Sequence, residues 1–230
     1  MIKAVLFDKD GTLFDFQATW ADWAANAIED FASGDAERVG VIAQALGFDM
    51  SGRFFDPTSP VIAGTIQEQA QLLVPHVPEF SKADIAARMV ELASDAPQVE
   101  AVPLFEFLNG LRSRAYKLGV ATNDAESSAR AHLGKAGVVE LFDFIAGYDS
   151  GWGSKPEPGQ LRAFAEAVDL PPEQIAMVGD STHDLHAARA GGMAAVGVLT
   201  GPADEATLAP FADVVLPSIR DLPDWLATHQ

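Results

Sequence analysis

Short apolar segments of strand length recur along the chain. After residue 102 most of them alternate with segments in which apolar residues return every three or four positions, which is the spacing of an amphipathic helix. This alternation predicts repeated βα units and a parallel sheet, because parallel neighbours need a crossover connection, usually a helix. The predicted strands span residues 3–7, 117–121, 142–146, 174–178, 194–198 and 213–216.

The pattern changes between the first predicted strand and the second. Helical spacing dominates there and no strand pattern stands out; the helical segments span residues 20–32, 36–47, 63–73 and 81–93. We therefore expect an α/β core domain of residues 1–14 and 103–230, and an all-helical domain of residues 15–102 inserted after the first strand. Within that insert, Trp20, Trp23, Ala27 and Phe31 form a helical stripe that is typical of packing rather than of a cofactor site.

Composition narrows the range of functions. The 230 residues suffice for one large domain with an insert. The 33 acidic and 15 basic residues give a net charge of -18, which argues against nucleic acid or an anionic membrane surface as a partner. The absence of cysteine excludes disulfides, thiol catalysis and Cys-ligated zinc. No signal-peptide pattern and no apolar run of membrane-spanning length is present, so we expect a cytoplasmic protein.

Polar side chains follow four of the predicted strands. In an open parallel sheet, ligands bind outside the carboxyl ends of the strands, so these residues are expected to share one edge. They are Asp8, Asp10, Gly11 and Thr12 after the first strand; Thr122, Asn123 and Asp124 after the second; Ser154, Lys155 and Pro156 beyond the third; and Asp180, Ser181, Thr182, His183 and Asp184 after the fourth.

The carboxylates of this set predict a metal site. Gathered carboxylates repel one another unless a cation lies among them, and hard divalent cations take oxygen ligands. Asp8, Asp10, Asp180 and Asp184 are therefore candidate ligands for Mg²⁺, which prefers to share its coordination with a phosphate. Lys155 and the threonine hydroxyls would contact the other oxygens of a phosphoryl group. Asp-Lys-Asp-Gly alone would also suit a turn, but a turn explains only one aspartate and the glycine.

Four segments together resemble a known family. Phe7 to Leu13 (FDKDGTL), Thr122-Asn123, Lys155-Pro156 and Gly179 to Asp184 (GDSTHD) resemble, in order, the four motifs of the haloacid dehalogenase-like hydrolases. The helical insert looks like the C1 cap of that superfamily, and the general layout is most similar to phosphoglycolate phosphatase-like members. The resemblance implies a Rossmann-like core sheet with a C1 cap domain.

The resemblance also implies roles for the matching residues. Asp8 would be the nucleophile that forms an aspartyl-phosphate, and Asp10 the general acid and base, which in the family also binds the metal through its backbone carbonyl. Thr122 would hydrogen-bond the phosphoryl group and Lys155 would offset its charge. Asp180 would complete the Mg²⁺ site, with Asp184 binding the ion directly or standing behind a direct ligand. Gly11, Thr12 and Asn123 would help bind the substrate.

One residue of the insert is a further candidate. Arg53 lies in the segment SGRFFDP, which is expected to be an irregular loop between helices, and C1 cap loops of this superfamily contact the substrate. Arg53 could bind the non-reacting end of the substrate, although a solvent-facing arginine explains it equally well.

The function implied is a Mg²⁺-dependent phosphatase acting on a small phosphorylated metabolite, with phosphoglycolate as the first choice and a monomer or homodimer as the working form. A sugar-phosphate mutase of the β-phosphoglucomutase type shares the core motifs and stays open. From another class, a phospho-accepting signalling domain also uses an aspartyl-phosphate, a threonine and a lysine. Such receiver domains, however, run to about half this length and place their acidic pair before the phosphorylated aspartate.

Overall fold

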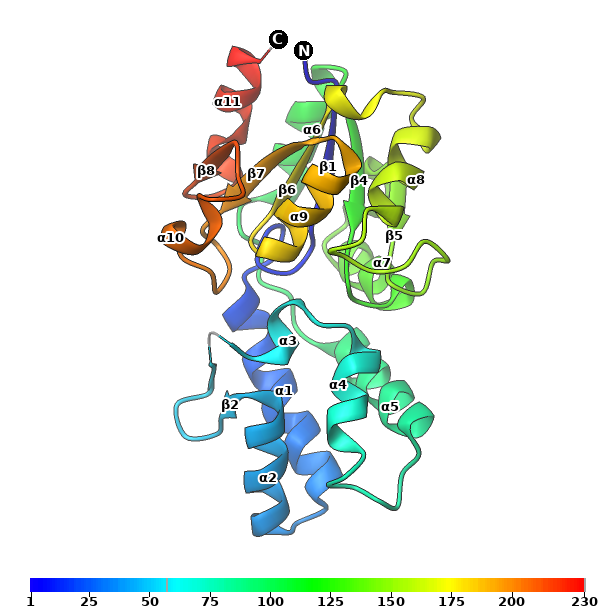
Figure 1. Ribbon diagram of the computed structural model, residues 1–230, viewed down its shortest axis with the longest axis vertical. Helices are drawn as coiled ribbons and strands as arrows, with labels where there is room; N and C mark the ends of the chain where they lie inside the picture. The colour runs from blue at the N-terminus through cyan, green and yellow to red at the C-terminus, as the bar shows by residue number, and fades with distance from the viewer. Residues whose placement is uncertain (57, 230) are drawn as a thin grey trace. The chain divides into compact units, whose positions relative to one another are not determined.

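The computed structural model describes residues 1–56 and 58–229 (Figure 1). The chain divides into two compact units. The first, which we call the core unit, consists of Met1–Phe16 and the chain from Gln98 onward; the second, the insert unit, is Gln17–Pro97. No helix of the described residues is long and apolar enough to cross a membrane.

The core unit contains a parallel sheet. Over the described residues the sheet has six strands in the order β5-β4-β1-β6-β7-β8. All six strands predicted from the apolar segments are confirmed, with ends that differ by two residues or fewer. The strands are β1 (Ala4–Phe7), β4 (Lys117–Ala121), β5 (Phe144–Ala146), β6 (Ile175–Gly179), β7 (Ala194–Val198) and β8 (Val214–Leu216).

Strand β1 is central because it pairs with β4 on one side and β6 on the other, with Ala4 opposite both Lys117 and Ile175. From β4 the chain continues outward to β5, and it then returns to form β6 on the opposite side of β1. This reversal of strand order opens a crevice at the carboxyl end of the neighbouring strands, which is where ligands bind in such sheets.

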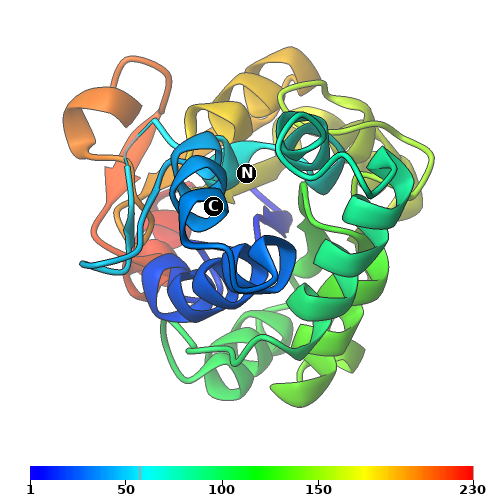
Figure 2. The same cartoon turned by 90° about the horizontal axis from the view of Figure 1, so that it is seen from below.

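Side chains alternate between the two faces of the sheet. Val5 and Phe7 belong to the hydrophobic cluster that includes residues of α6, α7 and α11, whereas Ala4 and Leu6 belong to the cluster that includes residues of α8, α9 and α10. Figure 2 shows α6 in green and α9 in gold on opposite sides of the strands. The helices of the core unit are α6 (Leu104–Ser113), α7 (Glu126–Lys135), η1 (Val139–Leu141), α8 (Gly159–Ala167), η2 (Pro172–Gln174), α9 (Thr182–Gly191), α10 (Glu205–Leu208), η3 (Ile219–Asp221) and α11 (Leu222–Thr228).

The insert unit is mainly helical, and its helices begin at sequence signals that stabilise helix N-termini. The Asp35 side chain accepts hydrogen bonds at the start of α2, and Thr65 and Ser81 form capping boxes with Glu68 and Asp84 at α4 and α5. The stripe of Trp20, Trp23, Ala27 and Phe31 is buried, as its spacing predicts. The helices are α1 (Phe16–Ala32), α2 (Ala36–Leu46), α3 (Pro60–Ala63), α4 (Ile66–Leu73) and α5 (Lys82–Asp95).

The expectation of an all-helical insert is wrong at one place. An antiparallel hairpin joins β2 (Phe48–Asp49) to β3 (Phe54–Phe55), and the rings of Phe48 and Phe55 pack with their centroids 4.9 Å apart. The Asp49 carboxylate accepts hydrogen bonds from the backbone of Ser51 and Gly52 and so closes the turn. Strands of two residues are too short to show a period-two pattern, so the hydrophobic pattern contains no signal for this hairpin.

Candidate active site

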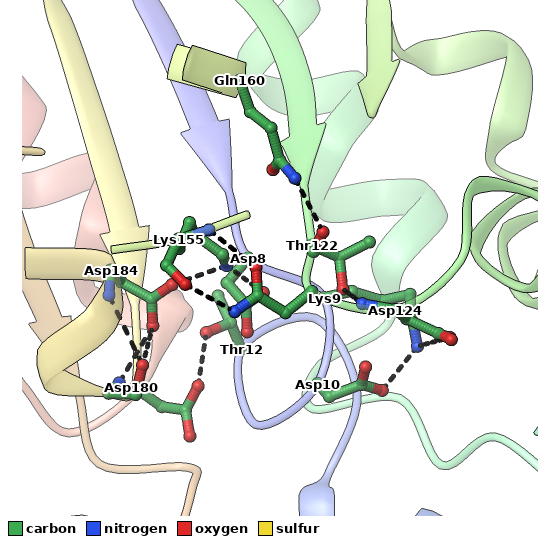
Figure 3. A network of polar contacts seen from close by, with 12 residues as sticks. Asp8, Lys9, Asp10, Thr12, Thr122, Asp124, Lys155, Gln160, Asp180 and Asp184 are labelled. Atoms are coloured by element: carbon green, nitrogen blue, oxygen red, sulfur yellow. Dashed lines mark hydrogen bonds and ion pairs between the residues drawn. The ribbon is translucent and has the colours of Figure 1, made fainter. Parts of the chain in front are cut away.

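Asp8 lies directly beyond the central strand. Its backbone N–H donates to the carbonyl of Val178 at 2.8 Å, which extends the pairing of β1 and β6 by one residue. Because side chains alternate along a strand, Asp8 points toward the same face as Ala4 and Leu6, the face covered by α8 and α9. Figure 3 shows Asp8 beside Lys155 and Asp184, which come from the two later motifs.

Lys155 joins two of the carboxylates. Its Nζ lies 2.6 Å from Oδ1 of Asp8 and 2.6 Å from Oδ1 of Asp184, and its side chain is 3% exposed. Burial alone would lower the pKa of Lys155, but the charges of Asp184 and Asp8 outweigh burial and raise the pKa. Lys155 is therefore a charged group at the centre of the site. The side chain of Asn123 holds the Lys155 backbone through two reciprocal hydrogen bonds of 2.8 and 2.9 Å.

Asp184 is positioned by the start of helix α9. Its Oδ2 accepts from the backbone N–H and the hydroxyl of Ser181, and Ser181 accepts from the N–H of Asp184, so the two residues form a capping box. The same local pattern that begins the helix therefore fixes a carboxylate in the site. Both oxygens of Asp184 have protein partners, one in the cap and one in Lys155.

A divalent cation fits among the carboxylates. Oxygen atoms of Asp8, Asp180 and Asp184 lie within 4.8 Å of one another, and all three residues are buried. Within residues 1–56 and 58–229, Oδ2 of Asp180 is buried without a hydrogen-bond partner. Burial raises the pKa of Asp8 to about 7, against the opposing charge of Lys155, and burial together with the charges of Asp8 and Asp184 raises the pKa of Asp180 well above its usual range. A cation would favour the ionised form of both groups and give the orphaned oxygen a ligand.

The expected set of four carboxylates is only partly brought together. The cluster contains Asp8, Asp180 and Asp184, whereas the carboxylate of Asp10 pairs with Lys9, with Lys9 Nζ 2.6 Å from Asp10 Oδ1. Figure 3 shows Asp10 separated from Asp180 and Asp184 by the chain that carries Thr12. Asp10 follows the strand in the loop, where alternation no longer directs it, so its carboxylate is not part of a four-carboxylate cage.

The remaining core candidates surround the same strand ends. Thr12 is buried and its hydroxyl lies 3.5 Å from Oδ1 of Asp180. Gly11 has φ +81°, and a Cβ placed there would lie 2.3 Å from Oδ2 of Asp180. The hydroxyl of Thr122 accepts from the backbone N–H of Asp124, which begins the turn that follows β4. These contacts bring Gly11 and Thr12 to the Asp180 side of the site and leave Thr122 at the end of β4.

Arg53 lies in the turn of the β2–β3 hairpin, in the insert unit, and not in an irregular loop. Its backbone has φ +53°, its carbonyl accepts from Gln17 Nε2 at 2.5 Å, and its Nη2 lies 3.1 Å from Asp22 Oδ1. The side chain is 51% exposed. The Arg53 guanidinium is thus held by an exposed ion pair and remains open to solvent.

The sequence reasoning missed two residues that shape the site. The first is Lys9, which lies between the two aspartates of the first motif and is buried. Gln160, in the first turn of α8, donates from Nε2 to the carbonyls of Thr122 and Gly153 and so ties the second motif to the loop before Lys155. A charged residue in a buried strand end was a signal for Lys9; a single glutamine in a helix offered none for Gln160.

Comparison with known proteins identifies the family. The family model of the haloacid dehalogenase-like hydrolases matches residues 2–192. The chain belongs to the haloacid dehalogenase-like hydrolases. The resemblance predicted from the four motifs is therefore confirmed, and with it the assignment of the chain to hydrolytic enzymes.

Individual relatives agree with this family. The chain is 30% identical to the phosphoglycolate phosphatase of Rhodospirillum rubrum over all of this chain and 93% of that protein. CbbY from Rhodobacter sphaeroides, solved in complex with phosphate, is 25% identical with a TM-score of 0.67 over 96% of both chains. The β-phosphoglucomutase of Clostridium difficile has a TM-score of 0.72 at 20% identity over 99% of this chain and 96% of its own, a likeness of fold alone.

The contact between Gly201 and Asp180 gives a first prediction. Gly201 follows β7, and a Cβ added there would lie 1.7 Å from Oδ2 and 2.6 Å from Cβ of Asp180. Gly201→Ala should displace the Asp180 carboxylate and weaken Mg²⁺ binding by about tenfold or more, because groups around metal ligands commonly contribute that much to affinity. Isothermal titration calorimetry with Mg²⁺ measures the change.

Gly110→Ala is the matched control. Gly110 lies on the exposed side of α6 with nothing within 4 Å of the added Cβ, so this substitution should leave Mg²⁺ affinity unchanged and stabilise the helix slightly. Equal Mg²⁺ affinity in Gly201→Ala and the parent protein would contradict the expectation that Asp180 is a metal ligand.

Proposed function

We propose that the protein is a Mg²⁺-dependent phosphatase that hydrolyses a small phosphate monoester through an aspartyl-phosphate on Asp8. The observation that carries the proposal is the convergence of Asp8, Lys155, Asp180 and Asp184 at the carboxyl end of the central strand, in a member of a hydrolase family. A carboxylate suits the nucleophile because, once ionised, it needs no separate base to activate it, whereas a serine would.

In the first half-reaction, a carboxylate oxygen of Asp8 attacks phosphorus and the bond from phosphorus to the ester oxygen breaks. The proton that the leaving oxygen requires comes from the carboxyl group of Asp10. Only Oδ1 of Asp8 takes part in the ion pair with Lys155, so that pair leaves Oδ2 for the attack. The products of this step are the alcohol, the phosphorylated Asp8 and ionised Asp10.

In the second half-reaction, a water molecule attacks the same phosphorus and gives a proton to the Asp10 carboxylate. The bond from phosphorus to Asp8 breaks, and inorganic phosphate leaves with the Asp8 carboxylate restored. Asp10 ends protonated, ready for the next ester. The two aspartates of the first motif therefore have different tasks, since Asp8 exchanges the phosphoryl group and Asp10 exchanges the proton.

The metal would be held by Asp8 and Asp180, with Asp10 contributing its backbone carbonyl as in the family. When bound, Mg²⁺ supplies positive charge that offsets the negative charge of the phosphoryl oxygens. In our proposal Asp184 does not bind the ion directly, because its oxygens accept hydrogen bonds from Ser181 and Lys155. Lys155 offsets the repulsion between the Asp8 and Asp184 carboxylates and, in the substrate complex, pairs with a phosphoryl oxygen.

The second motif and the glycine-threonine turn would complete the phosphoryl site. Thr122 and Thr12 offer hydroxyl groups, and Gly11 allows the backbone to approach Asp180 without a side chain. Asn123 contributes by holding the backbone of Lys155, which supports a positioning task for this residue in place of direct substrate contact. Phosphoglycolate is the first candidate substrate, on the strength of the named relative from Rhodospirillum rubrum.

Arg53 is proposed to bind the carboxylate of such a substrate. Arg53→Ala should raise KM for phosphoglycolate by about tenfold with little change in kcat, because it removes binding that ground state and transition state share. KM for p-nitrophenyl phosphate, which has no carboxylate, should stay unchanged. Arg88→Ala is the control, since Arg88 is an exposed, ion-paired arginine of the same unit. An unchanged KM for phosphoglycolate in Arg53→Ala would exclude this contact.

The experiment that tests the function measures phosphate release from a panel of phosphate monoesters, with Mg²⁺ and with the metal removed by EDTA. We expect release that is lost with EDTA and restored by Mg²⁺, with phosphoglycolate among the best substrates. The panel includes β-glucose 1-phosphate, and its products are separated. Conversion to glucose 6-phosphate without phosphate release would favour the mutase, and a lasting phosphoprotein without turnover would favour the signalling domain.

A further inference from the structure

Lys9 occupies an unusual position for a charged side chain. Its side chain is fully buried, and its Nζ lies 2.6 Å from Asp10 Oδ1, 3.4 Å from Asp124 Oδ2 and 3.1 Å from His132 Nδ1. A buried ammonium group is costly to desolvate, and replacing a whole buried ion pair by apolar residues of similar size is often neutral or stabilising. Stability alone therefore does not account for a lysine beside Asp10.

The direction of the Lys9 side chain follows from the strand. Asp8 and Lys9 are neighbours, so they point to opposite faces of the sheet. Asp8 meets Lys155 and Asp184 on the α8 and α9 side, whereas Lys9 reaches His132 on α7. Asp8, which would exchange the phosphoryl group, and Lys9, which contacts Asp10, are therefore adjacent in the chain but lie on opposite faces of the sheet.

The partners of Lys9 anchor it to rigid elements. Asp124 follows β4 and its backbone N–H donates to Thr122, and His132 lies buried in α7. An ammonium group only donates, so Nδ1 of His132 must accept. Burial alone would lower the pKa of Lys9, but the charges of Asp10 and Asp124 outweigh burial and raise the pKa. The Lys9 ammonium group is thus held in place by Asp124 and His132, which lie outside the loop that carries Asp10.

The consequence for Asp10 is a fixed orientation. Its side chain is 14% exposed, Oδ1 is bound by Lys9, and Oδ2 lies outside this ion pair. We propose that Lys9 is a positioning residue that orients the Asp10 carboxyl group for proton transfer in both half-reactions. This inference rests on the proposed phosphatase function, and it assigns Lys9 no contact with substrate.

The proposal predicts a selective loss of rate. Alkyl esters leave as poor anions and need a proton from Asp10, whereas p-nitrophenolate leaves without one. Loss of Lys9 should therefore slow phosphorylation of Asp8 by an alkyl ester by about a hundredfold and by p-nitrophenyl phosphate by about threefold or less. Hydrolysis of the aspartyl-phosphate, which needs Asp10 as the base for either substrate, should slow by about a hundredfold.

The variants are chosen to keep the protein folded. Lys9→Met alone leaves Asp10 and Asp124 buried without a cation, so it is made both alone and with Asp124→Asn. The comparison is between Lys9→Met/Asp124→Asn and Asp124→Asn, which differ only in Lys9 and both lack the Asp124 charge. Circular dichroism and thermal unfolding establish that each variant is folded. Rapid-quench measurements then follow release of the alcohol and decay of phosphorylated Asp8.

The expected result is a larger loss in the rate of alcohol release for the alkyl ester than for p-nitrophenyl phosphate. With p-nitrophenyl phosphate as the substrate, the double variant should also accumulate more phosphoenzyme than Asp124→Asn. An equal loss for both esters, without extra phosphoenzyme, would overturn the positioning task and leave Lys9 a structural residue. The proposed function fails separately, if the parent protein releases no phosphate or if Asp8→Asn releases it as fast as the parent.

Discussion

Asp8→Asn is expected to lower Mg²⁺-dependent phosphate release by about four orders of magnitude or more, because the amide is neutral and cannot act as the nucleophile that forms the aspartyl-phosphate. The variant should also take up no phosphate at residue 8, which intact-protein mass spectrometry of acid-quenched samples measures. Folding should be retained, since the substitution removes one negative charge from a buried cluster of three carboxylates while Lys155 keeps Asp184 as a partner.

Asp224→Asn controls for the change of an aspartate to its amide. Asp224 is exposed in the first turn of α11, so activity should stay at the parent level. A residual rate in Asp8→Asn within about tenfold of the parent would reject covalent catalysis by Asp8, because removal of a nucleophile costs far more than that.

Lys155→Met is expected to remove activity and to destabilise the metal-free protein by about 3 kcal/mol, since removing one partner of a buried ion pair leaves the other charge uncompensated. Here two carboxylates, Asp8 and Asp184, would lose their shared cation. Mg²⁺ should recover much of the lost stability, because a divalent cation neutralises the same carboxylates and binds only the folded state. Urea unfolding with EDTA and with Mg²⁺ measures both effects.

Lys117→Met provides the comparison. Lys117 also pairs with an aspartate, with its Nζ 3.2 Å from Asp143 Oδ1, but its side chain is 52% exposed. Exposed ion pairs contribute about 1 kcal/mol or less, so this variant should unfold near the parent and show no added dependence on Mg²⁺. Equal destabilisation by the two substitutions would mean that burial of Lys155 has no energetic consequence, contrary to the charge distribution of the site.

The elements of the core were accessible from the sequence because their signals are local. Strands β1 and β6 at the centre of the parallel sheet are buried along their whole length and therefore appear as apolar runs, as in Ile175–Gly179. The starts of the insert helices were also present as capping patterns, at Thr65 and Ser81. The β2–β3 hairpin had no such signal, because two-residue strands are held by a turn and by the Phe48–Phe55 contact, which is a tertiary feature.

Some features of the candidate site likewise follow from the sequence, and others depend on the tertiary structure. The sequence by itself determined which residues follow each strand and hence that Asp8, Thr122, Lys155 and Asp180 would come near one edge of the sheet; their catalytic roles stay predictions. Only the tertiary structure decided which groups pair across the chain. Asp8 and Asp10 are two residues apart, yet one pairs with Lys155 and the other with Lys9.

The physical reason is that strand alternation and helix packing act over different distances. The period of two places Asp8 and Lys9 on opposite faces, and this can be read from the sequence once the strand is known. Which partner lies on each face depends on the packing of α7, which carries His132, and of the loop before α8, which carries Lys155. Both residues lie more than a hundred positions away in the sequence. The sequence alone determined the chemistry available to the site, and the packing of these two segments decided how its charges are divided.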